Sequence, residues 1–264
     1  MSIFFFLISF LASIAGAICG IGGGVIIKPT LDMFQFASVS TISFLSGCTV
    51  LAMSGYSVSK ALVSHGSRVN MKIGTLLAIG AAIGGVLGKD MFSGIKEMFA
   101  DPNTVGSVQA ACVLLITLGT LIYTLRKDKI STHHAKNMVV CVIIGMLLGV
   151  MSSFLGIGGG PINLVVLFFF FSMDTKTAAQ NSLYIILFSQ FTSLIATLVT
   201  RAVPKFDPLS LILMVAGGIF GGMVGRIFNI RMDNKAVDKL FMILMILIIG
   251  ISIFNIVLYS GVFS

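Results

Sequence analysis

The chain alternates long apolar runs with short polar stretches. Ten apolar segments can be marked off, at about residues 3–19, 25–37, 42–62, 73–93, 106–125, 138–155, 161–173, 178–200, 208–228 and 239–259. Most approach the roughly 20 residues that a helix needs to cross a 30 Å hydrocarbon core. The second and seventh segments hold only about 13 residues each, which is roughly 20 Å of helix, so we expect half-helices or arms of hairpins there. The pattern predicts an all-α polytopic membrane protein.

The two halves of the chain repeat each other. The sequence Gly-Ile-Gly-Gly-Gly at residues 20–24 recurs at residues 156–160. Three glycines at four-residue spacing followed by a basic residue also occur twice, as Gly80, Gly84, Gly88 and Lys89, and as Gly217, Gly221, Gly225 and Arg226. Two landmarks at nearly one offset indicate an internal duplication. We predict a transmembrane repeat at 1–128, a basic linker at 129–136 and a second repeat at 137–264, together forming one membrane domain.

The basic residues distinguish between two arrangements in the membrane. If each GIGGG lies within a simple span, the eight spans place eight basic residues on one side and nine on the other. If the chain reverses at each GIGGG, the split becomes twelve against four, with Lys28 left inside the membrane. The second split obeys the positive-inside rule. It predicts two inverted repeats of about five helical segments each, each repeat with a Gly-rich break before a short half-helix, and both termini outside.

Composition removes several classes of function. Of the 264 residues, 57% are hydrophobic and 10% are charged, which excludes a soluble enzyme, a disordered chain and a secreted disulfide scaffold. The net charge of +8 is explained by cytoplasmic loops, so we expect the lipid bilayer and no nucleic acid as a partner. No catalytic constellation or metal-ligand motif is present in the sequence. We therefore expect a non-enzyme without a cofactor or a metal, and the oligomeric state is left open.

The glycine runs are candidate substrate sites. Irregular backbone at membrane depth is tolerated where it lines a cavity, and a helix N-terminus favours an anion. Pro161 directly follows the second run and suits the first turn of a helix. We predict that the two runs face each other and bind one small anion through Gly22, Gly23, Gly24, Gly158, Gly159 and Gly160. For the glycines at four-residue spacing we favour simple packing, with the third and fourth helices crossing closely.

Several side chains could complete such a site. Lys28 lies one helical turn after Gly24, where it either neutralises the bound anion or snorkels to the membrane surface. Asp32 is either a proton site or a helix cap. Four polar residues of the third segments are further candidates for contact with the substrate, although interhelical hydrogen bonds would also explain them: Ser46, Asn181, Ser182 and Gln190.

These motifs resemble the sulfite exporter TauE/SafE family, also called the toluene-sulfonate uptake permease family. The resemblance rests on the duplicated GIGGG, on Lys28-Pro29, on Asn181-Ser182-Leu183, and on Val69-Asn70 leading into the glycine-spaced helix. It implies a multi-pass plasma-membrane transporter for sulfur-containing anions such as sulfite or sulfonates. Alternating access, in which one repeat rocks against the other, is the implied mechanism, and coupling to protons is compatible with it. A passive anion channel and a permease for another small organic anion are the alternatives.

Overall fold

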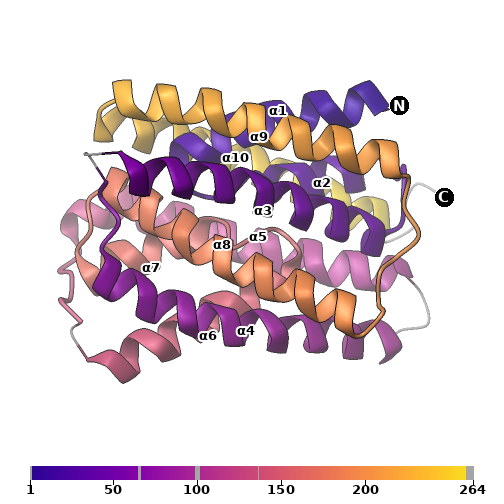
Figure 1. Ribbon diagram of the computed structural model, residues 1–264, viewed down its shortest axis with the longest axis horizontal. Helices are drawn as coiled ribbons and strands as arrows, with labels where there is room; N and C mark the ends of the chain where they lie inside the picture. Colours follow the sequence, from indigo (N-terminus) through magenta and orange to yellow (C-terminus); the bar gives the residue numbers. More distant parts are fainter. Residues whose placement is uncertain (1, 65–66, 99–101, 136, 260–264) are drawn as a thin grey trace.

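The computed structural model describes residues 2–64, 67–98, 102–135 and 137–259 (Figure 1). These ranges hold ten α-helices and one 3₁₀ turn: α1 (Ser2–Cys19), α2 (Gly24–Phe34), α3 (Val39–Val63), α4 (Met71–Met98), α5 (Pro102–Arg126), η1 (Lys127–Lys129), α6 (Met138–Leu155), α7 (Pro161–Phe171), α8 (Thr175–Val199), α9 (Pro208–Arg231) and α10 (Asn234–Tyr259). The predicted all-α membrane fold is confirmed. Residue 136, the last of the predicted linker, lies outside the described residues.

Helix lengths agree with the predicted division into long and short segments. Seven helices within the described ranges are long and apolar enough to cross a membrane, namely α3, α4, α5, α6, α8, α9 and α10. Helices α2 and α7 have 11 residues each, so neither can span a bilayer unaided. The two half-helices expected from the sequence are therefore present.

The chain reverses direction at each GIGGG. In the first half, the rings of Phe4 at the start of α1 and Phe34 at the end of α2 stack edge to face, with centroids 5.0 Å apart. In the second half, the linker just before α6 is bonded to the end of α7, where the Ala135 N–H donates to the Phe170 carbonyl at 2.9 Å. Helices α1 and α2, and likewise α6 and α7, therefore form hairpins. The arrangement of eight simple spans is excluded.

The helix ends gather at two opposite ends of the molecule. Helix α1 begins, and α10 ends, at the right of Figure 1. The segments joining α3 to α4, α5 to α6 and α9 to α10 lie at the left, and α8 begins there. Those basic residues that the charge count assigns together and that the structure describes thus share one end. Which end faces the cytoplasm, and the inverted relation of the halves, stay predictions.

Two rows of glycines at four-residue spacing, which we call the glycine stripes, lie on α4 (Gly80, Gly84 and Gly88) and on α9 (Gly217, Gly221 and Gly225). They pack helices together, as expected, but the helices that they bring together are not the expected ones. A Cβ atom on Gly84 of α4 would lie 2.0 Å from the Met146 carbonyl oxygen of α6, and one on Gly221 of α9 would lie 2.4 Å from the Phe10 carbonyl oxygen of α1. The expectation that the stripes serve a crossing with the third helix of their own half is therefore wrong. Small residues let two backbones approach closely, whatever their order in the chain. Each stripe uses this freedom to pack against the first helix of the opposite half, so the two halves interlock.

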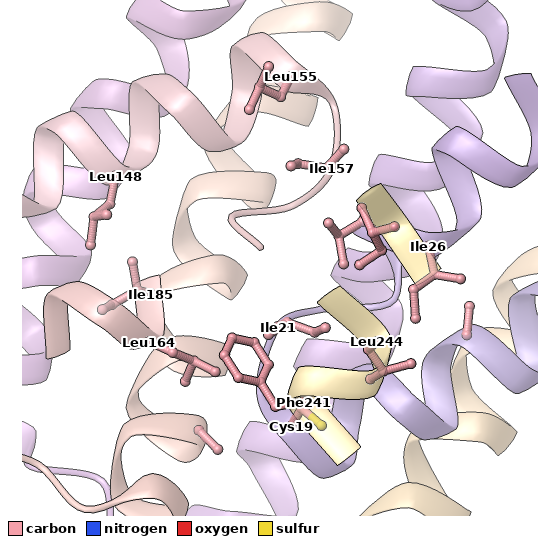
Figure 2. Close-up of a cluster of buried hydrophobic side chains, with 14 of the residues drawn as sticks. Cys19, Ile21, Ile26, Leu148, Leu155, Ile157, Leu164, Ile185, Phe241 and Leu244 are labelled. Carbon is pink, nitrogen blue, oxygen red and sulfur yellow. The ribbon is translucent and has the colours of Figure 1, made fainter. Parts of the chain in front are cut away.

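A continuous apolar core joins the halves around the glycine turns (Figure 2). Ile21 and Ile157, the isoleucines of the two GIGGG runs, are at most 1% exposed and belong to this core. Leu164 of α7 and Phe241 of α10 pack into the same cluster. Burial of these side chains anchors both turns deep within the protein.

Short polar residues begin the helices that follow the connecting segments. The Asp174 carboxylate accepts the Thr177 N–H at 2.9 Å and caps α8. The Asp207 carboxylate accepts the Ser210 hydroxyl at 2.7 Å and the Ser210 N–H at 3.0 Å, and these bonds hold its pKa below the usual value. Both carboxylates satisfy N–H groups that the first turn of a helix leaves without intrahelical partners.

Candidate functional site

The backbone of both GIGGG turns depends on glycine. Gly20 and Gly22 have φ angles of +76° and +74°, and Gly156 and Gly158 have φ angles of +65° and +75°. Side chains with a Cβ rarely adopt this left-handed conformation, whereas glycine does so freely. The turns therefore stop α1 and α6 abruptly. The helix predicted to begin at Pro161 does begin there, as α7.

The two turns face each other across the centre of the protein, as predicted. A Cβ atom on Gly24 would lie 2.5 Å from the Ile157 carbonyl oxygen, and one on Gly22 would lie 3.2 Å from the Gly158 carbonyl oxygen. The two backbones thus touch directly, forming a closed contact that we call the glycine seam (residues 20–24 against 156–160). Binding of substrate by Gly22, Gly23, Gly24, Gly158, Gly159 and Gly160 stays a prediction.

Lys28 is paired within its own helix. Its ammonium nitrogen lies 2.7 Å from the Asp32 carboxylate, one turn further along α2, and both residues are buried. With 3% of its surface exposed, Lys28 does not snorkel to the membrane surface. Asp32 uses its side chain for this ion pair and does not cap the helix. A contact between Lys28 and substrate stays a prediction.

The polar residues proposed on the third segments lie in different surroundings. The Asn181 amide oxygen accepts the Asn70 N–H at 3.0 Å, and the amide nitrogen donates to the Arg68 carbonyl at 3.1 Å. Gln190 lies more than two turns further along α8 and donates to the Ser152 hydroxyl at 3.1 Å. The structure therefore does not bring Asn181 and Gln190 to one point. The hydroxyls of Ser46 and Ser182 are buried without a hydrogen-bond partner among the described residues.

A cavity of about 240 Å³ lies at the basic end of the molecule, between the two halves. Its polar lining consists mainly of three cationic side chains, two amides and a hydroxyl: Arg68, Lys176, Arg226, Gln180, Asn229 and Ser57. Neither Asp nor Glu is among the described residues that line it. We call this space the basic cavity. Like charges gathered without a lining carboxylate repel one another, and an anion bound among them would relieve that repulsion.

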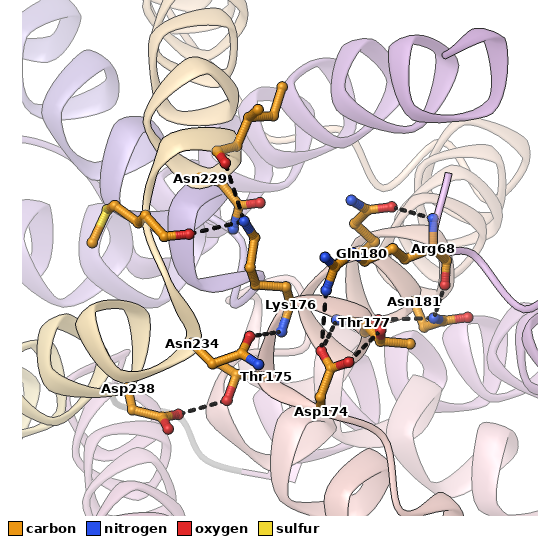
Figure 3. A network of polar contacts seen from close by, with 12 residues as sticks. Arg68, Asp174, Thr175, Lys176, Thr177, Gln180, Asn181, Asn229, Asn234 and Asp238 are labelled. Carbon is orange, nitrogen blue, oxygen red and sulfur yellow. Dashed lines mark hydrogen bonds and ion pairs between the residues drawn. The ribbon is translucent and has the colours of Figure 1, made fainter. Parts of the chain in front are cut away.

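Each cation of the basic cavity is held by a hydrogen bond or an ion pair, and Figure 3 shows those of Lys176 and Arg68. The Lys176 ammonium donates to the Met232 carbonyl at 2.9 Å and to the Ile230 carbonyl at 3.2 Å, at the end of α9. The Arg226 guanidinium donates to the Ser57 carbonyl at 3.2 Å. The Arg68 guanidinium lies 3.5 Å from the half-exposed Asp174 carboxylate. The hydrogen-bond partners of Lys176 and Arg226 are therefore neutral carbonyl groups, whereas Arg68 has a carboxylate partner.

Helix α8 fixes the segment that carries Arg68. The Gln180 amide oxygen accepts the Arg68 N–H at 2.9 Å, next to the bond that the Asn181 amide nitrogen donates to the Arg68 carbonyl (Figure 3). Sequence reasoning counted Arg68, Lys176 and Arg226 as charges that orient the protein in the membrane, and Arg226 also as a landmark of the repeat, but none of them as a site residue. The sequence offered one signal that could have linked them, because the charge count assigns all three residues to the same side of the membrane. Their convergence on one cavity depends on contacts between segments more than 40 residues apart.

The inner end of the basic cavity reaches the glycine seam. Ala17 and Ala179 line the cavity, and a Cβ atom on Gly20 would lie 2.3 Å from the Ala179 Cα atom. The Asn229 amide, also in the lining, donates to the Ile18 carbonyl at 2.6 Å. The cavity therefore adjoins the glycine seam. Polar side chains line the cavity, and the close backbone contact of the seam closes its inner end.

Comparison with known proteins shows which family this chain resembles. A sequence profile described as Sulfite exporter TauE/SafE matches residues 5–253, which include both glycine turns and the whole basic cavity. The Bacillus subtilis (strain 168) protein named Probable membrane transporter protein YunE is 24% identical over 277 residues, with 96% of each chain covered. No solved structure matches the chain.

Proposed function

The chain belongs to the sulfite exporter TauE/SafE family of membrane transporters, and from that premise we propose that it carries small sulfur-containing anions, such as sulfite or sulfonates, across the plasma membrane. The basic cavity carries this proposal, because it brings Arg68, Lys176 and Arg226 together with no lining carboxylate in the described chain. Guanidinium and amide groups donate hydrogen bonds to the oxygen atoms of such anions.

The route through the protein follows from the position of the cavity. An anion entering at the basic end meets the cations first and then the glycine seam, which is closed by backbone contact between Gly24 and Ile157. We propose alternating access, in which one repeat rocks against the other, opening the seam and closing the basic cavity. Coupling to a driving ion would make the transport concentrative.

Purified protein in liposomes tests the proposal. Uptake of radiolabelled sulfite, sulfate, thiosulfate and taurine is measured with and without a pH gradient. We expect saturable uptake of at least one sulfur oxyanion or sulfonate. Uptake that rises linearly with concentration would indicate a passive channel, and the absence of any anion flux or binding would overturn the proposal.

The Arg226→Gln variant tests the role of the basic cavity. It removes one charge from the lining while keeping a hydrogen-bond donor, and hydrogen bonds to charged groups contribute about 1.5–3 kcal/mol. We expect the KM for the anion to rise by roughly 10- to 100-fold, the factor that this free energy corresponds to. Arg231→Gln is the matched control, because Arg231 lies on the same helix, is exposed and does not line the cavity. Equal effects of the two variants would exclude a specific role for Arg226.

A further inference from the structure

Of the three cations that line the basic cavity, Arg68 alone makes no side-chain hydrogen bond to a described residue. The Lys176 ammonium donates two hydrogen bonds to backbone carbonyls, and the Arg226 guanidinium donates one. The Arg68 guanidinium instead lies beside the Asp174 carboxylate, with 3.5 Å between the nearest nitrogen and oxygen atoms. A charge-assisted hydrogen bond between such groups is about 2.7–2.9 Å long. The ion pair is therefore loose, and the guanidinium keeps its donors available for another oxyanion.

Hydrogen bonds fix the surroundings of this ion pair but not the Arg68 side chain itself. The Arg68 N–H donates to the Gln180 amide oxygen at 2.9 Å, and the Arg68 carbonyl accepts a hydrogen bond from the Asn181 amide nitrogen at 3.1 Å. The Asp174 carboxylate caps α8, where it accepts the Thr177 N–H at 2.9 Å and the Thr177 hydroxyl at 3.1 Å (Figure 3). A change of partner therefore requires only rotation of the Arg68 side chain.

Arg68 lies at the boundary between the basic cavity and the solvent. Its side chain is 45% exposed and lines the cavity, whereas the Asp174 side chain is 48% exposed and is not part of the lining. A guanidinium offers the same planar set of N–H groups to a carboxylate and to a sulfur oxyanion. The Asp174 carboxylate and an anion in the cavity therefore compete for one group.

We propose that Asp174 is a resident competitor of the substrate, which holds Arg68 while the basic cavity is empty and releases it to the anion that enters. This role deepens the proposed function and rests on it. In the empty cavity the carboxylate compensates the charge of Arg68, which would otherwise add to the repulsion among the three cations. Because the anion must displace this partner, Asp174 lowers the apparent affinity of the cavity and raises the concentration at which it fills.

The Asp174→Asn variant in liposomes tests this competition. Asn caps a helix as well as Asp does, so the variant keeps the start of α8 while it removes the negative charge. Uptake of radiolabelled sulfite, sulfate, thiosulfate and taurine is measured as a function of concentration at constant ionic strength. For each anion that the wild type carries, we expect KM to fall by about two- to fivefold with a smaller change in kcat, because exposed ion pairs are weak. Asp174→Ser, a second neutral cap, should give the same result.

Asp233→Asn is the matched control. Asp233 is also exposed, and its carboxylate accepts the Ala236 N–H at 2.8 Å at the start of α10. It lies at the same basic end, next to Asn234, whose amide oxygen accepts the Lys176 N–H at 3.3 Å. Within the described chain it neither pairs with Arg68 nor lines the cavity. This variant therefore removes the same charge without freeing the guanidinium, and its KM should stay close to that of the wild type.

A double variant shows whether the effect passes through Arg68. In the Arg68→Gln background the carboxylate has no guanidinium to hold, so adding Asp174→Asn should leave KM unchanged. An equal fall in KM in both backgrounds would overturn the competition and leave Asp174 as a helix cap whose charge acts only at a distance.

The outcomes separate this role from the proposed function. If the wild type carries an anion and Asp174→Asn leaves its KM unchanged, raises it, or lowers it no more than Asp233→Asn does, the competition is overturned while the proposed function stands. Absence of uptake of all four anions by the wild type would overturn the proposed function and the role of Asp174 with it.

Discussion

At the scale of single residues, the structure separates side chains that line a cavity from side chains that position them. The Asn181 amide is occupied by the backbone of residues 68–70 and by the Thr177 carbonyl, to which it donates at 2.8 Å. Asn181 is therefore a positioning residue for Arg68 in this conformation. Lys28, which looked like an isolated intramembrane charge in the sequence, is neutralised by Asp32.

An Asn181→Leu variant tests this positioning role. It leaves the Asn70 N–H without its acceptor, at a cost of about 1–3 kcal/mol, and releases the segment that holds Arg68. We expect the KM for the anion to rise several-fold with a smaller change in kcat, as measured by uptake into liposomes. In the Arg68→Gln background the same substitution should have little further effect on KM. Fully additive effects of the two substitutions would contradict positioning through Arg68.

At the scale of helices, glycine decides which surfaces can meet. The stripe on α4 faces α6 and the stripe on α9 faces α1, with carbonyl oxygens where a Cβ atom would have to lie. Glycines that do not meet another helix carry no such constraint: a Cβ atom on Gly119 of α5 would have no neighbour within 4 Å. The contrast shows that position in the packed bundle, and not glycine content, determines the effect of substitution.

A pair of glycine-to-alanine variants tests this distinction. Gly84→Ala places a methyl group 2.0 Å from the Met146 carbonyl oxygen, so α4 and α6 must move apart. We expect a loss of about 1–3 kcal/mol or more in stability, measured as a lower melting temperature in detergent. Gly119→Ala should leave the melting temperature unchanged or raise it slightly, because alanine favours the helix over glycine. Equal destabilisation by both variants would refute close α4–α6 packing.

At the scale of the whole molecule, the two halves form one interlocked body. Helix α1 of the first half depends on α9 of the second, and α6 of the second half depends on α4 of the first. The basic cavity likewise takes Arg68 from the first half and Lys176 and Arg226 from the second. Neither half holds a complete core or a complete cavity.

Expressing the halves separately tests this interdependence. Residues 1–128 or 137–264 produced alone should aggregate or be degraded, because their glycine-lined faces lack partners. The two fragments produced together should assemble and regain anion uptake, as measured by co-purification and a liposome assay. If either fragment expressed alone were stable and remained monodisperse in detergent, the interlocked packing would be contradicted.

The orientation in the membrane offers a separate test. The charge count predicts that the basic end faces the cytoplasm, so a reporter inserted after Lys129 should read cytoplasmic, and a reporter fused to the C-terminus should read external. Oppositely placed reporters would reverse the direction in which the basic cavity opens.

The amino-acid sequence by itself determined the all-helical membrane fold, the bounds of the helices to within a few residues, and the reversal of the chain at each GIGGG. These features depend on hydrophobic length, on local backbone conformation and on the distribution of basic residues along the chain, and none of them requires knowing how the helices pack. The facing of the two glycine turns was also foreseen, because a duplicated chain places equivalent segments in equivalent positions.

Only the tertiary structure decided which helix each glycine stripe meets, that Lys28 pairs with Asp32, and that Arg68, Lys176 and Arg226 line one cavity. A small residue permits close approach by any helix of suitable shape, and a basic residue near a helix end carries the same signal whether it faces water or a cavity. Those choices are made by packing between distant segments, where shape and charge must be satisfied together across both halves.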